Sequence, residues 1–536
     1  MLKSSSMRLP KRSASTNLKE LGLKIKKIYG APGTGKTRTM LDLLQEEIER
    51  GTPLERIAFV THTVAAKLEA KERIQRVIQI VDEKTQLRYF RTIHGICYVE
   101  NDLKRDNVMQ PEDYLAFGDS VGIPFSSNFT SDVDMDGLPI GFNLSGGNEI
   151  LAVRQLAAAK RCMVSDIPEE WPKWAGVDIM REVITKYAEW KDKHAKFDFV
   201  DMLFLYEKHG EPLDIDVLFI DEAQDLSGMQ WAIVKRMMAR AERVYIAGDD
   251  DQMIYAFIGA DRYGFLDFPA DDLVVLPKTY RLQKNIWEHA QRIIKAVHRR
   301  QEKQVSVRDD GGVVDYYNND ILFFDIDPTK SSMIIARHHF QLQRLAKSLE
   351  ARGIPYKGRG REVTKTDQAY AVHAYIRARN GEKISLRDAS LILRFIGDKK
   401  GSTKLRKESR TDPGLLIDKE QLEREFGLRW TDKWHTYLAR NRAEVTKCEL
   451  IDNIIHNIGL DGLVAEPSVS LTTYHGSKGR EADHVICFTD CFKSAYDTAV
   501  LNPDDERRLA YVGVTRARER LTVFLPTTDL YMRTML

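Results

Sequence analysis

The sequence contains few cysteines, no long apolar run and almost no net charge. Five cysteines among 536 residues are too sparse for a disulfide framework, and their odd number fits a reducing compartment such as the cytoplasm. No run of 18 apolar residues occurs, so we expect no helix that spans a membrane. The formal net charge is +2, so a nucleic-acid site would have to be a local basic groove rather than a property of the whole chain.

The length and composition indicate a globular protein with several domains. A chain of 536 residues is too long for one compact core and predicts two to four domains. Residues 1–16 are basic, rich in serine and free of acids, and we interpret residues 1–20 as a disordered basic tail rather than a transit peptide. Cys487 and Cys491 lie close in sequence, but no second pair lies near them, so we interpret them as ordinary thiols rather than zinc ligands.

Strands and helices alternate near the start of the chain. The pattern predicts a strand at Ile25–Tyr29, a helix at Thr37–Arg50, a strand at Ile57–Thr61 and a further helix to about Val81. This order implies a parallel sheet covered by helices. Further strands are predicted at Val217–Ile220, Val244–Ala247, Leu273–Leu276, Met333–Ala336 and Val485–Thr489. Residues 118–148 resemble a loop and residues 361–455 are helical and charged, so we expect two α/β cores with helical insertions.

A glycine-rich loop, GAPGTGKT at Gly30–Thr37, lies between the first predicted strand and helix. It matches the phosphate-loop pattern at every fixed position. Its glycines allow a tight turn whose backbone N–H groups point at phosphate oxygens, next to a helix N-terminus. Lys36 would reach the β and γ phosphates, and the Thr37 hydroxyl would hold Mg²⁺.

A second motif, LFIDEAQD at Leu218–Asp225, is an apolar strand that ends in two acids. Side chains diverge along a strand, so Asp221 can face a magnesium ion while Glu222 faces the attacking water. Phosphoryl transfer also needs positive charge at the developing anion. Arg281 and Arg516 are candidates for it, although the pattern alone does not select them.

The motifs occur in an order that resembles the UvrD/Rep-like helicases of superfamily 1A. The matching segments are GAPGTGKT (30–37), FVTHTVAAKLEAKERI (59–74), TIHGICY (92–98), DFVDML (198–203), LFIDEAQD (218–225), VYIAGDDDQMIYAFIGA (244–260), LPKTYRLQKNI (276–286), MIIARHHFQLQRLAKSLEARGIPY (333–356), VSLTTYHGSKGREADHVI (469–486) and DERRLAYVGVTRARERL (505–521).

The resemblance implies a role for each matching residue. It makes Lys36 and Glu222 catalytic, with Gln252 as the γ-phosphate sensor and with Arg281 and Arg516 as arginine fingers from two sides of a cleft. Thr37 and Asp221 are the implied metal ligands. The implied ATP-binding set is Gly30, Ala31, Pro32, Gly33, Thr34, Gly35, Lys36, Thr37, Arg38, Tyr280, Arg281, Glu481 and Arg516. Within this set, Tyr280 and Arg38 would flank the adenine, and Glu481 would touch the ribose.

The resemblance also implies contacts with single-stranded DNA. Tyr255 and Phe257 would stack on bases, and the remaining implied contacts are Thr61, His62, Thr92 and His94. The alternative for Tyr255, Phe257 and His62 is a place in the core.

The domain organisation that we expect is α/β, with two recA-like cores. Its parts are a tail at 1–20, core 1A at 21–98 and 196–285, insertion 1B at 99–195, core 2A at 286–360 and 456–536, and insertion 2B at 361–455.

The implied function is an ATP-dependent DNA helicase that moves 3′ to 5′ on single strands and unwinds duplexes, using ATP and Mg²⁺. We expect single-stranded DNA and single-strand/duplex junctions as partners. We expect the protein to be a monomer or weak dimer in the cytoplasm of a bacterial or phage-infected cell. One alternative is a translocase that displaces bound proteins with little unwinding. Another is a phosphate-loop kinase or GTPase, but no N-K-x-D base reader is evident.

Several segments depart from the family or imitate other sites. No glutamine segment precedes the phosphate loop, so recognition of adenine rests mainly on Tyr280. The basic run at 397–410 allows a duplex-binding patch, but we interpret it as a solvated loop. DVDMDG at Asp132–Gly137 imitates the start of a calcium loop, yet position twelve is Asn143 instead of a glutamate.

Overall fold

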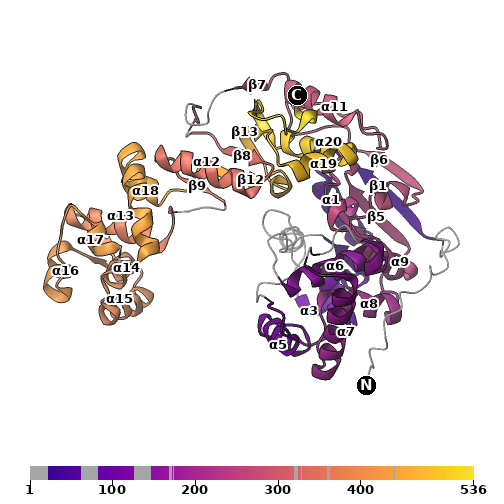
Figure 1. The fold of residues 1–536 in the computed structure, drawn as a ribbon, viewed down its shortest axis with the longest axis horizontal. Coiled ribbons are helices and arrows are strands. Elements are labelled where there is room, and N and C mark those ends of the chain that lie inside the picture. Colours follow the sequence, from indigo (N-terminus) through magenta and orange to yellow (C-terminus); the bar gives the residue numbers. More distant parts are fainter. Residues whose placement is uncertain are drawn as a thin grey trace. The chain divides into compact units, whose positions relative to one another are not determined.

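A computed structural model describes most of the chain, which divides into two compact units (Figure 1). The first unit comprises Met1–Gly312 and Thr498–Thr515, and the second comprises Val313–Asp497 and Arg516–Leu536. The described residues are 22–61, 82–125, 146–167, 172, 174–318, 324–327, 329–358, 363–439 and 441–536. The expected tail at 1–20, the helix expected to about Val81, His62 and the segment Asp132–Gly137 lie outside them.

The first unit contains a six-stranded sheet in the order β3-β2-β4-β5-β1-β6, and every neighbouring pair is parallel. Its strands are β1 (Lys24–Tyr29), β2 (Ile57–Val60), β3 (Phe90–Arg91), β4 (Val217–Ile220), β5 (Arg243–Gly248) and β6 (Asp272–Val275). Strands β2 and β4 are buried at every position, as near-continuous apolar runs in a parallel sheet should be. The strands predicted in this part of the sequence are confirmed, with ends that differ by at most one residue.

Helices cover both faces of this sheet. Leu218 and Ile220 of β4 pack in one apolar cluster, and Val217 and Phe219 pack in another on the opposite face. The helices of the first unit are α1 (Lys36–Glu49), α3 (Glu83–Gln86), α4 (Ile93–Glu100), α5 (Pro111–Val121), α6 (Gly147–Lys160), α7 (Val177–His194), α8 (Phe199–His209), α9 (Gly228–Met237), α10 (Gly264–Asp267), α11 (Lys284–Ile294) and α20 (Pro503–Val514). Helix α1 begins one residue before the predicted Thr37, and α5 extends to Val121, into the segment predicted as a loop.

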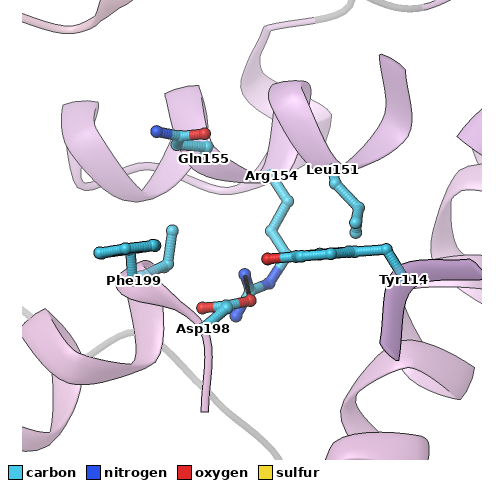
Figure 2. Close-up of a pocket in the computed structure, with 7 residues that line it drawn as sticks. Tyr114, Leu151, Arg154, Gln155, Asp198 and Phe199 are labelled. Atoms are coloured by element: carbon cyan, nitrogen blue, oxygen red, sulfur yellow. Dashed lines mark hydrogen bonds and ion pairs between the residues drawn. The ribbon is translucent and has the colours of Figure 1, made fainter. Parts of the chain in front are cut away.

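Helices α5, α6 and α7 share a separate apolar cluster, and a buried ion-pair network lies beside it. Arg154 donates to Asp198 at 2.8 Å, and the ammonium of Lys191 donates to the same carboxylate at 2.9 Å (Figure 2 shows Arg154 and Asp198). Asp198 also caps α8 by accepting the Asp201 N–H at 2.8 Å. The DFVDML segment therefore has a structural role here.

The second unit contains another six-stranded parallel sheet, in the order β7-β14-β13-β8-β12-β9. Its strands are β7 (Val313–Tyr317), β8 (Ser332–Ala336), β9 (Tyr356–Lys357), β12 (Val469–Thr473), β13 (Ala482–Phe488) and β14 (Ala517–Phe524). Helix α12 (His339–Ala351) follows β8, and α19 (Lys493–Leu501) follows β13. The predicted α/β class with two parallel-sheet cores is confirmed.

A helical bundle is inserted into the second unit. It contains α13 (Asp367–Arg379), α14 (Leu386–Ile396), α15 (Lys399–Thr411), α16 (Lys419–Phe426), α17 (His435–Leu438), α18 (Arg442–Ile458) and a small antiparallel pair, β10 (Ile384–Ser385) with β11 (Leu416–Ile417). The interpretation of residues 397–410 as a loop is wrong, because most of them form α15. Asp398 caps this helix through Gly401 N–H at 2.9 Å, and Leu405 is buried in the bundle core.

Among the described helices, none is both long and apolar enough to cross a membrane. All five cysteines lie within the described residues, and none of them forms a disulfide there. Burial raises the pKa of Cys487 to about 12, which fits the ordinary thiol that we expected.

Candidate functional site

The topology of the first sheet brings three predicted motifs to one edge. Strands β4, β5 and β1 are neighbours, and their parallel carboxyl ends point the same way. The phosphate loop follows β1, Asp221 and Glu222 follow β4, and Gln252 follows β5. Ligands of open parallel sheets bind at this edge.

The phosphate loop has the backbone that a phosphate cradle requires. Gly33 and Gly35 have φ of 76° and 81°, a region that favours glycine. A Cβ on Gly30 would lie 2.4 Å from the Thr34 hydroxyl, so no larger residue fits there. The Lys36 ammonium folds back onto the loop and donates to the Gly30 carbonyl at 2.9 Å. The loop thus holds its own cation near the position of a bound phosphate.

The segment Thr279–Arg281 is fastened to the phosphate loop. The Thr279 hydroxyl donates to the Pro32 carbonyl at 2.7 Å, and the Tyr280 N–H donates to the Gly33 carbonyl at 2.8 Å. A Cβ on Gly33 would lie 2.4 Å from the Cβ of Arg281. The structure therefore places Arg281 directly against the loop. Tyr280 is 67% exposed, with the Lys278 ammonium 5.5 Å from its ring centroid, and Arg38 is exposed on the first turn of α1.

Asp221 and Thr37, the predicted metal ligands, lie together. The Thr37 hydroxyl donates to the Asp221 carboxylate at 2.8 Å. Burial, followed by the charge of Glu222, raises the pKa of Asp221 to about 6, because nothing in this state fully offsets its buried charge. A buried carboxylate beside a hydroxyl supplies the hard oxygen donors that Mg²⁺ prefers, so this pair fits the ion.

Glu222, the predicted general base, has a strained backbone. Its φ of 54° and ψ of 39° are in the left-handed region, which non-glycine residues rarely adopt. This conformation ends β4 and turns the chain into a short 3₁₀ helix at Ala223–Asp225. The Gln224 side chain donates to the Glu222 carboxylate at 2.5 Å and fixes its direction.

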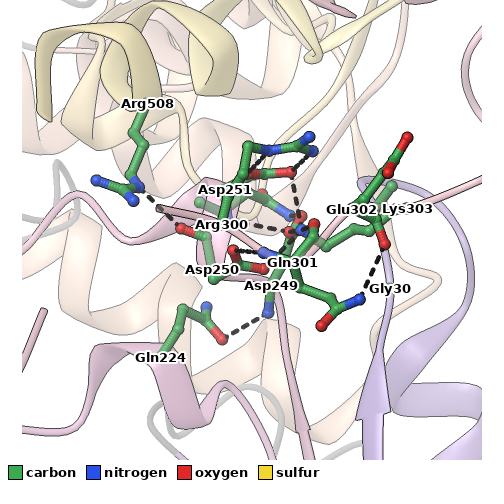
Figure 3. Close-up of polar contacts among 12 residues, drawn as sticks. Gly30, Gln224, Asp249, Asp250, Asp251, Arg300, Gln301, Glu302, Lys303 and Arg508 are labelled. Atoms are coloured by element: carbon green, nitrogen blue, oxygen red, sulfur yellow. Dashed lines mark hydrogen bonds and ion pairs between the residues drawn. The ribbon is translucent and has the colours of Figure 1, made fainter. Parts of the chain in front are cut away.

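A hydrogen-bonded chain joins Glu222 to the predicted sensor Gln252. The Gln224 amide oxygen accepts the Asp249 N–H at 3.0 Å (Figure 3). The Asp249 carboxylate in turn accepts the Gln252 amide N–H at 2.7 Å. Glu222 after β4 and Gln252 after β5 are therefore joined by one continuous network.

Three buried aspartates share one ammonium beneath the sensor. Lys303 lies 3.0 Å from Asp249, 2.6 Å from Asp250 and 2.8 Å from Asp251, and it is almost completely buried (Figure 3). Burial opposes the charge of Lys303, but the three carboxylates outweigh it and raise the pKa of the ammonium. Lys303 is thus the shared counter-charge of these aspartates. Arg300 also donates two hydrogen bonds to the Asp251 carboxylate, at 2.7 and 2.5 Å.

Helix α20 joins the same network, although it lies far along the chain. The buried Arg508 guanidinium donates to the Asp250 carbonyl at 3.0 Å and to the Arg299 carbonyl at 3.1 Å (Figure 3). Residues 249–252, called the sensor loop below, are therefore held by groups from residues 299–303 and from α20. Sequence reasoning missed Gln224, Asp249, Lys303 and Arg508. Gln224, Asp249 and Arg508 lie inside the recognised motifs, but Lys303 lies in a segment with no motif of its own.

Within the second unit, Glu481 and Arg516 lie near each other. Arg516 is buried, and its guanidinium donates to the Arg480 carbonyl at 3.4 Å. The Arg516 carbonyl accepts the Ala482 N–H at 3.1 Å. Glu481 accepts the Arg518 guanidinium N–H at 3.0 Å. Their roles toward a nucleotide stay predictions.

The predicted DNA contacts Thr61, Thr92 and His94 follow β2 and β3, which are neighbours at one side of the first sheet. Thr61 is buried, while Thr92 caps α4 by accepting the Gly95 N–H at 3.2 Å. His94 is half-buried and meets Phe199 edge-on at 5.7 Å. These residues share the sheet edge with the phosphate loop but lie on different strands.

Tyr255 and Phe257 follow β5 and lie close to the sensor loop. Their ring centroids are 6.4 Å apart. Tyr255 is only 8% exposed, whereas Phe257 is half-buried. Phe257 therefore offers more ring surface than Tyr255, and the stacking role of both stays a prediction.

Two family models match the chain. The model for an AAA domain matches residues 15–258, which include the phosphate loop, the Asp221–Glu222 pair and Gln252. The model for a UvrD-like helicase C-terminal domain matches residues 468–524, which include Glu481 and Arg516.

Curated relatives are similar to this chain over part of their length. The ATP-dependent DNA helicase PcrA of Bacillus subtilis is 26% identical over 313 residues, which cover 55% of this chain and 40% of the relative. The putative ATP-dependent DNA helicase YjcD of Bacillus subtilis is 25% identical over 339 residues, which cover 58% of this chain and 41% of the relative. The match thus spans about two fifths of the length of these relatives. With the order of the motifs and the two parallel sheets, these matches make the chain similar to the UvrD/Rep-like helicases of superfamily 1A.

Proposed function

We propose that this protein is an ATP-dependent DNA helicase that moves 3′ to 5′ on single-stranded DNA and unwinds duplexes. The observation that carries this proposal is the network along β4, β5 and β1. It joins the general base Glu222 to the sensor Gln252 at the edge where the phosphate loop lies. A motor needs such a link, because the state of the γ-phosphate must be reported beyond the site of hydrolysis.

The chemistry follows from the residues at this edge. The backbone N–H groups of the phosphate loop and the Lys36 ammonium neutralise the β and γ phosphates. Glu222 orients the attacking water and accepts its proton, and Gln224 holds that carboxylate in place. Mg²⁺, held by Thr37 and Asp221, would neutralise charge on the phosphates. Arg281, packed against Gly33, supports the charge that develops on the γ-phosphate.

We propose ATP and Mg²⁺ as cofactors, and single-stranded DNA and its junctions with duplex as partners. The names of the relatives, which are DNA helicases, support the choice of DNA. Thr61, His62, Thr92, His94, Tyr255 and Phe257 are the proposed contacts in the first unit. The small and odd number of cysteines, none of which forms a disulfide in the described residues, supports a reducing compartment, which we take to be the cytoplasm.

Unwinding assays on tailed duplexes test this function. DNA duplexes with a 3′ tail, a 5′ tail or blunt ends, and their RNA counterparts, are incubated with the protein, ATP and Mg²⁺. We expect strand separation on the 3′-tailed DNA alone, and none with Lys36→Ala.

Displacement of a tightly bound protein from single-stranded DNA is measured in parallel. Protein displacement without strand separation would show a translocase rather than a helicase. Unwinding of the 5′-tailed duplex would contradict the proposed polarity.

A further inference from the structure

Helix α20 connects two neighbouring strands of the second sheet, but it packs in the first unit. The chain leaves β13 at Phe488 and enters β14 at Ala517, and these strands are paired in parallel. Between them, Thr498–Thr515 belongs to the first unit. A helix that links two parallel strands usually packs on their own sheet. Both ends of α20 therefore continue into the second unit, while its contacts hold it in the first.

Arg508 attaches α20 to the sensor loop. Its guanidinium donates to the main-chain carbonyls of Asp250 and Arg299 at 3.0 and 3.1 Å (Figure 3 shows Arg508 and Asp250). Arg508 is 1% exposed, and the Asp505 carboxylate of the same helix lies 3.7 Å from it. A buried guanidinium is costly unless hydrogen bonds replace its water. Because Arg508 needs both carbonyls within reach, α20 and the sensor loop should move together.

The main chain that Arg508 holds belongs to the segment that carries the sensor. Asp250 begins the short 3₁₀ helix Asp250–Gln252, and Asp249 and Asp250 share the Lys303 ammonium. The Asp249 carboxylate accepts the Gln252 amide N–H at 2.7 Å. A shift of Gln252 toward a γ-phosphate would therefore displace the Asp250 carbonyl, and Arg508 with it.

We propose that Arg508 is a positioning residue that makes α20 follow the sensor loop and so transmits the state of the nucleotide to the second unit. The proposal rests on the proposed function, in which Gln252 senses the γ-phosphate. Helix α20 ends at Val514, two residues before Arg516, the predicted arginine finger. A packed helix transmits a small shift instead of absorbing it, because close-packed elements do not deform continuously.

Steady-state ATPase rates with and without saturating oligothymidylate test this role in the full-length protein. The quantity compared is the fold stimulation of kcat by the oligonucleotide. We expect Arg508→Gln to lower this stimulation roughly 5-fold or more, which is the lower end of a typical coupling between two sites. Arg508→Lys should restore part of it, because an ammonium can still donate to one of the two carbonyls.

A double-mutant cycle with Gln252 shows whether Arg508 acts through the sensor. Gln252→Ala removes the sensor amide and should itself lower the stimulation. If Arg508 acts through the sensor loop, adding Arg508→Gln to Gln252→Ala should cause no further loss. A purely structural role of Arg508 would instead lower the stimulation by the same factor in both backgrounds.

The matched control is Arg262→Gln. Arg262 also donates from its guanidinium to α20, at the Asp505 carboxylate, but this contact involves no residue of the sensor loop. The control should therefore keep the wild-type stimulation. Binding of a fluorescent ADP analogue and of the oligothymidylate is measured for each variant, so that loss of a binding site is recognised.

The outcomes distinguish the two proposals. Wild-type stimulation in Arg508→Gln would overturn the coupling role while leaving the helicase proposal intact. Equal losses in Arg508→Gln and Arg262→Gln, a further loss in the double variant, or loss of ADP or oligonucleotide binding in Arg508→Gln would show that Arg508 only stabilises the fold. A wild-type ATPase rate that does not respond to DNA would overturn the proposed function itself, and the coupling role with it.

Discussion

At the scale of single residues, Glu222 is the most constrained group at the site. Its left-handed backbone and its contact with Gln224 fix the carboxylate before any nucleotide binds. Such strain persists only where the surrounding structure holds it, and it often occurs at active sites. The strain and the contact together support the assignment of Glu222 as the general base.

Replacing Glu222 with glutamine should remove turnover and retain ATP binding. Because only the proton acceptor is lost, we expect kcat to fall by roughly 10²- to 10⁴-fold with little change in nucleotide affinity. Phosphate release and binding of a fluorescent ATP analogue measure the two effects. Glu242→Gln, which changes an exposed glutamate near β5, is the control. Wild-type turnover in Glu222→Gln would refute the assignment.

Lys36→Ala should differ from Glu222→Gln, because Lys36 contacts phosphate oxygens in the ground state as well. We expect both weaker nucleotide binding and the loss of turnover. Titration with the same fluorescent analogue distinguishes the two variants. Binding of equal strength in both would mean that the Lys36 ammonium stays on the Gly30 carbonyl.

Asp221 makes the stability of the nucleotide-free protein depend on pH. Its folded pKa of about 6 lies above the value of an unfolded aspartate, so folding favours its protonated form. The stability from this group is present below about pH 4 and is lost as the pH rises through 6. Asp221→Asn should therefore stabilise the protein by about 1–3 kcal/mol at pH 8 and by little at pH 4. Urea unfolding without nucleotide measures this, and an equal effect at both pH values would contradict it.

Residues within local motifs could be predicted, and residues that act over long separations could not. The phosphate loop and the Asp221–Glu222 pair each lie within one short segment, so their spacing carries the signal. Lys303 and Arg508 contact Asp250 across more than 50 and 250 positions, respectively. Arg508 lies within a recognised motif, but neither segment shows that its cation contacts Asp250, because that contact depends on the tertiary fold.

At the scale of elements, strands were easier to predict than the ends and extents of helices. Buried parallel strands are short apolar runs, and β4 was predicted with both ends correct. Helix α15 was missed because its sequence is polar and basic, with Leu405 as its one large apolar residue. Asp398 caps this helix by accepting the Gly401 N–H, and the Ser390 hydroxyl of α14 donates to the Ser402 carbonyl. These contacts stabilise a helix that its sequence alone does not predict.

The loop at residues 299–303 should stabilise the sensor loop, because Lys303 contacts its three aspartates. Lys303→Met would leave three buried aspartates without their shared counter-charge, so we expect a loss of about 3–5 kcal/mol of stability. Lys284→Met removes an exposed lysine 3.7 Å from Asp310 and should cost less than about 1 kcal/mol. Chemical unfolding compares the two. Equal losses would show that the buried cluster does not support the sensor loop.

At the scale of the whole molecule, the two parallel sheets could be predicted from the sequence. The two compact units, however, have other limits than the expected cores. The first unit extends to Gly312 and includes Thr498–Thr515, whereas the expected cores divided at 285 and assigned residues 456–536 to the second core. Helix α20 packs with residues that precede it by about 200 positions or more. The finer division into cores and insertions stays a proposal.

The central claim is that ATP hydrolysis at the β4, β5 and β1 edge drives movement on single-stranded DNA. The most direct measurement is the steady-state ATPase rate with Mg²⁺ as single-stranded DNA is titrated, beside Glu222→Gln to exclude contaminating activity. We predict a low basal rate that rises steeply and saturates with DNA, and no hydrolysis in the variant. A wild-type rate that does not change with DNA would contradict the account.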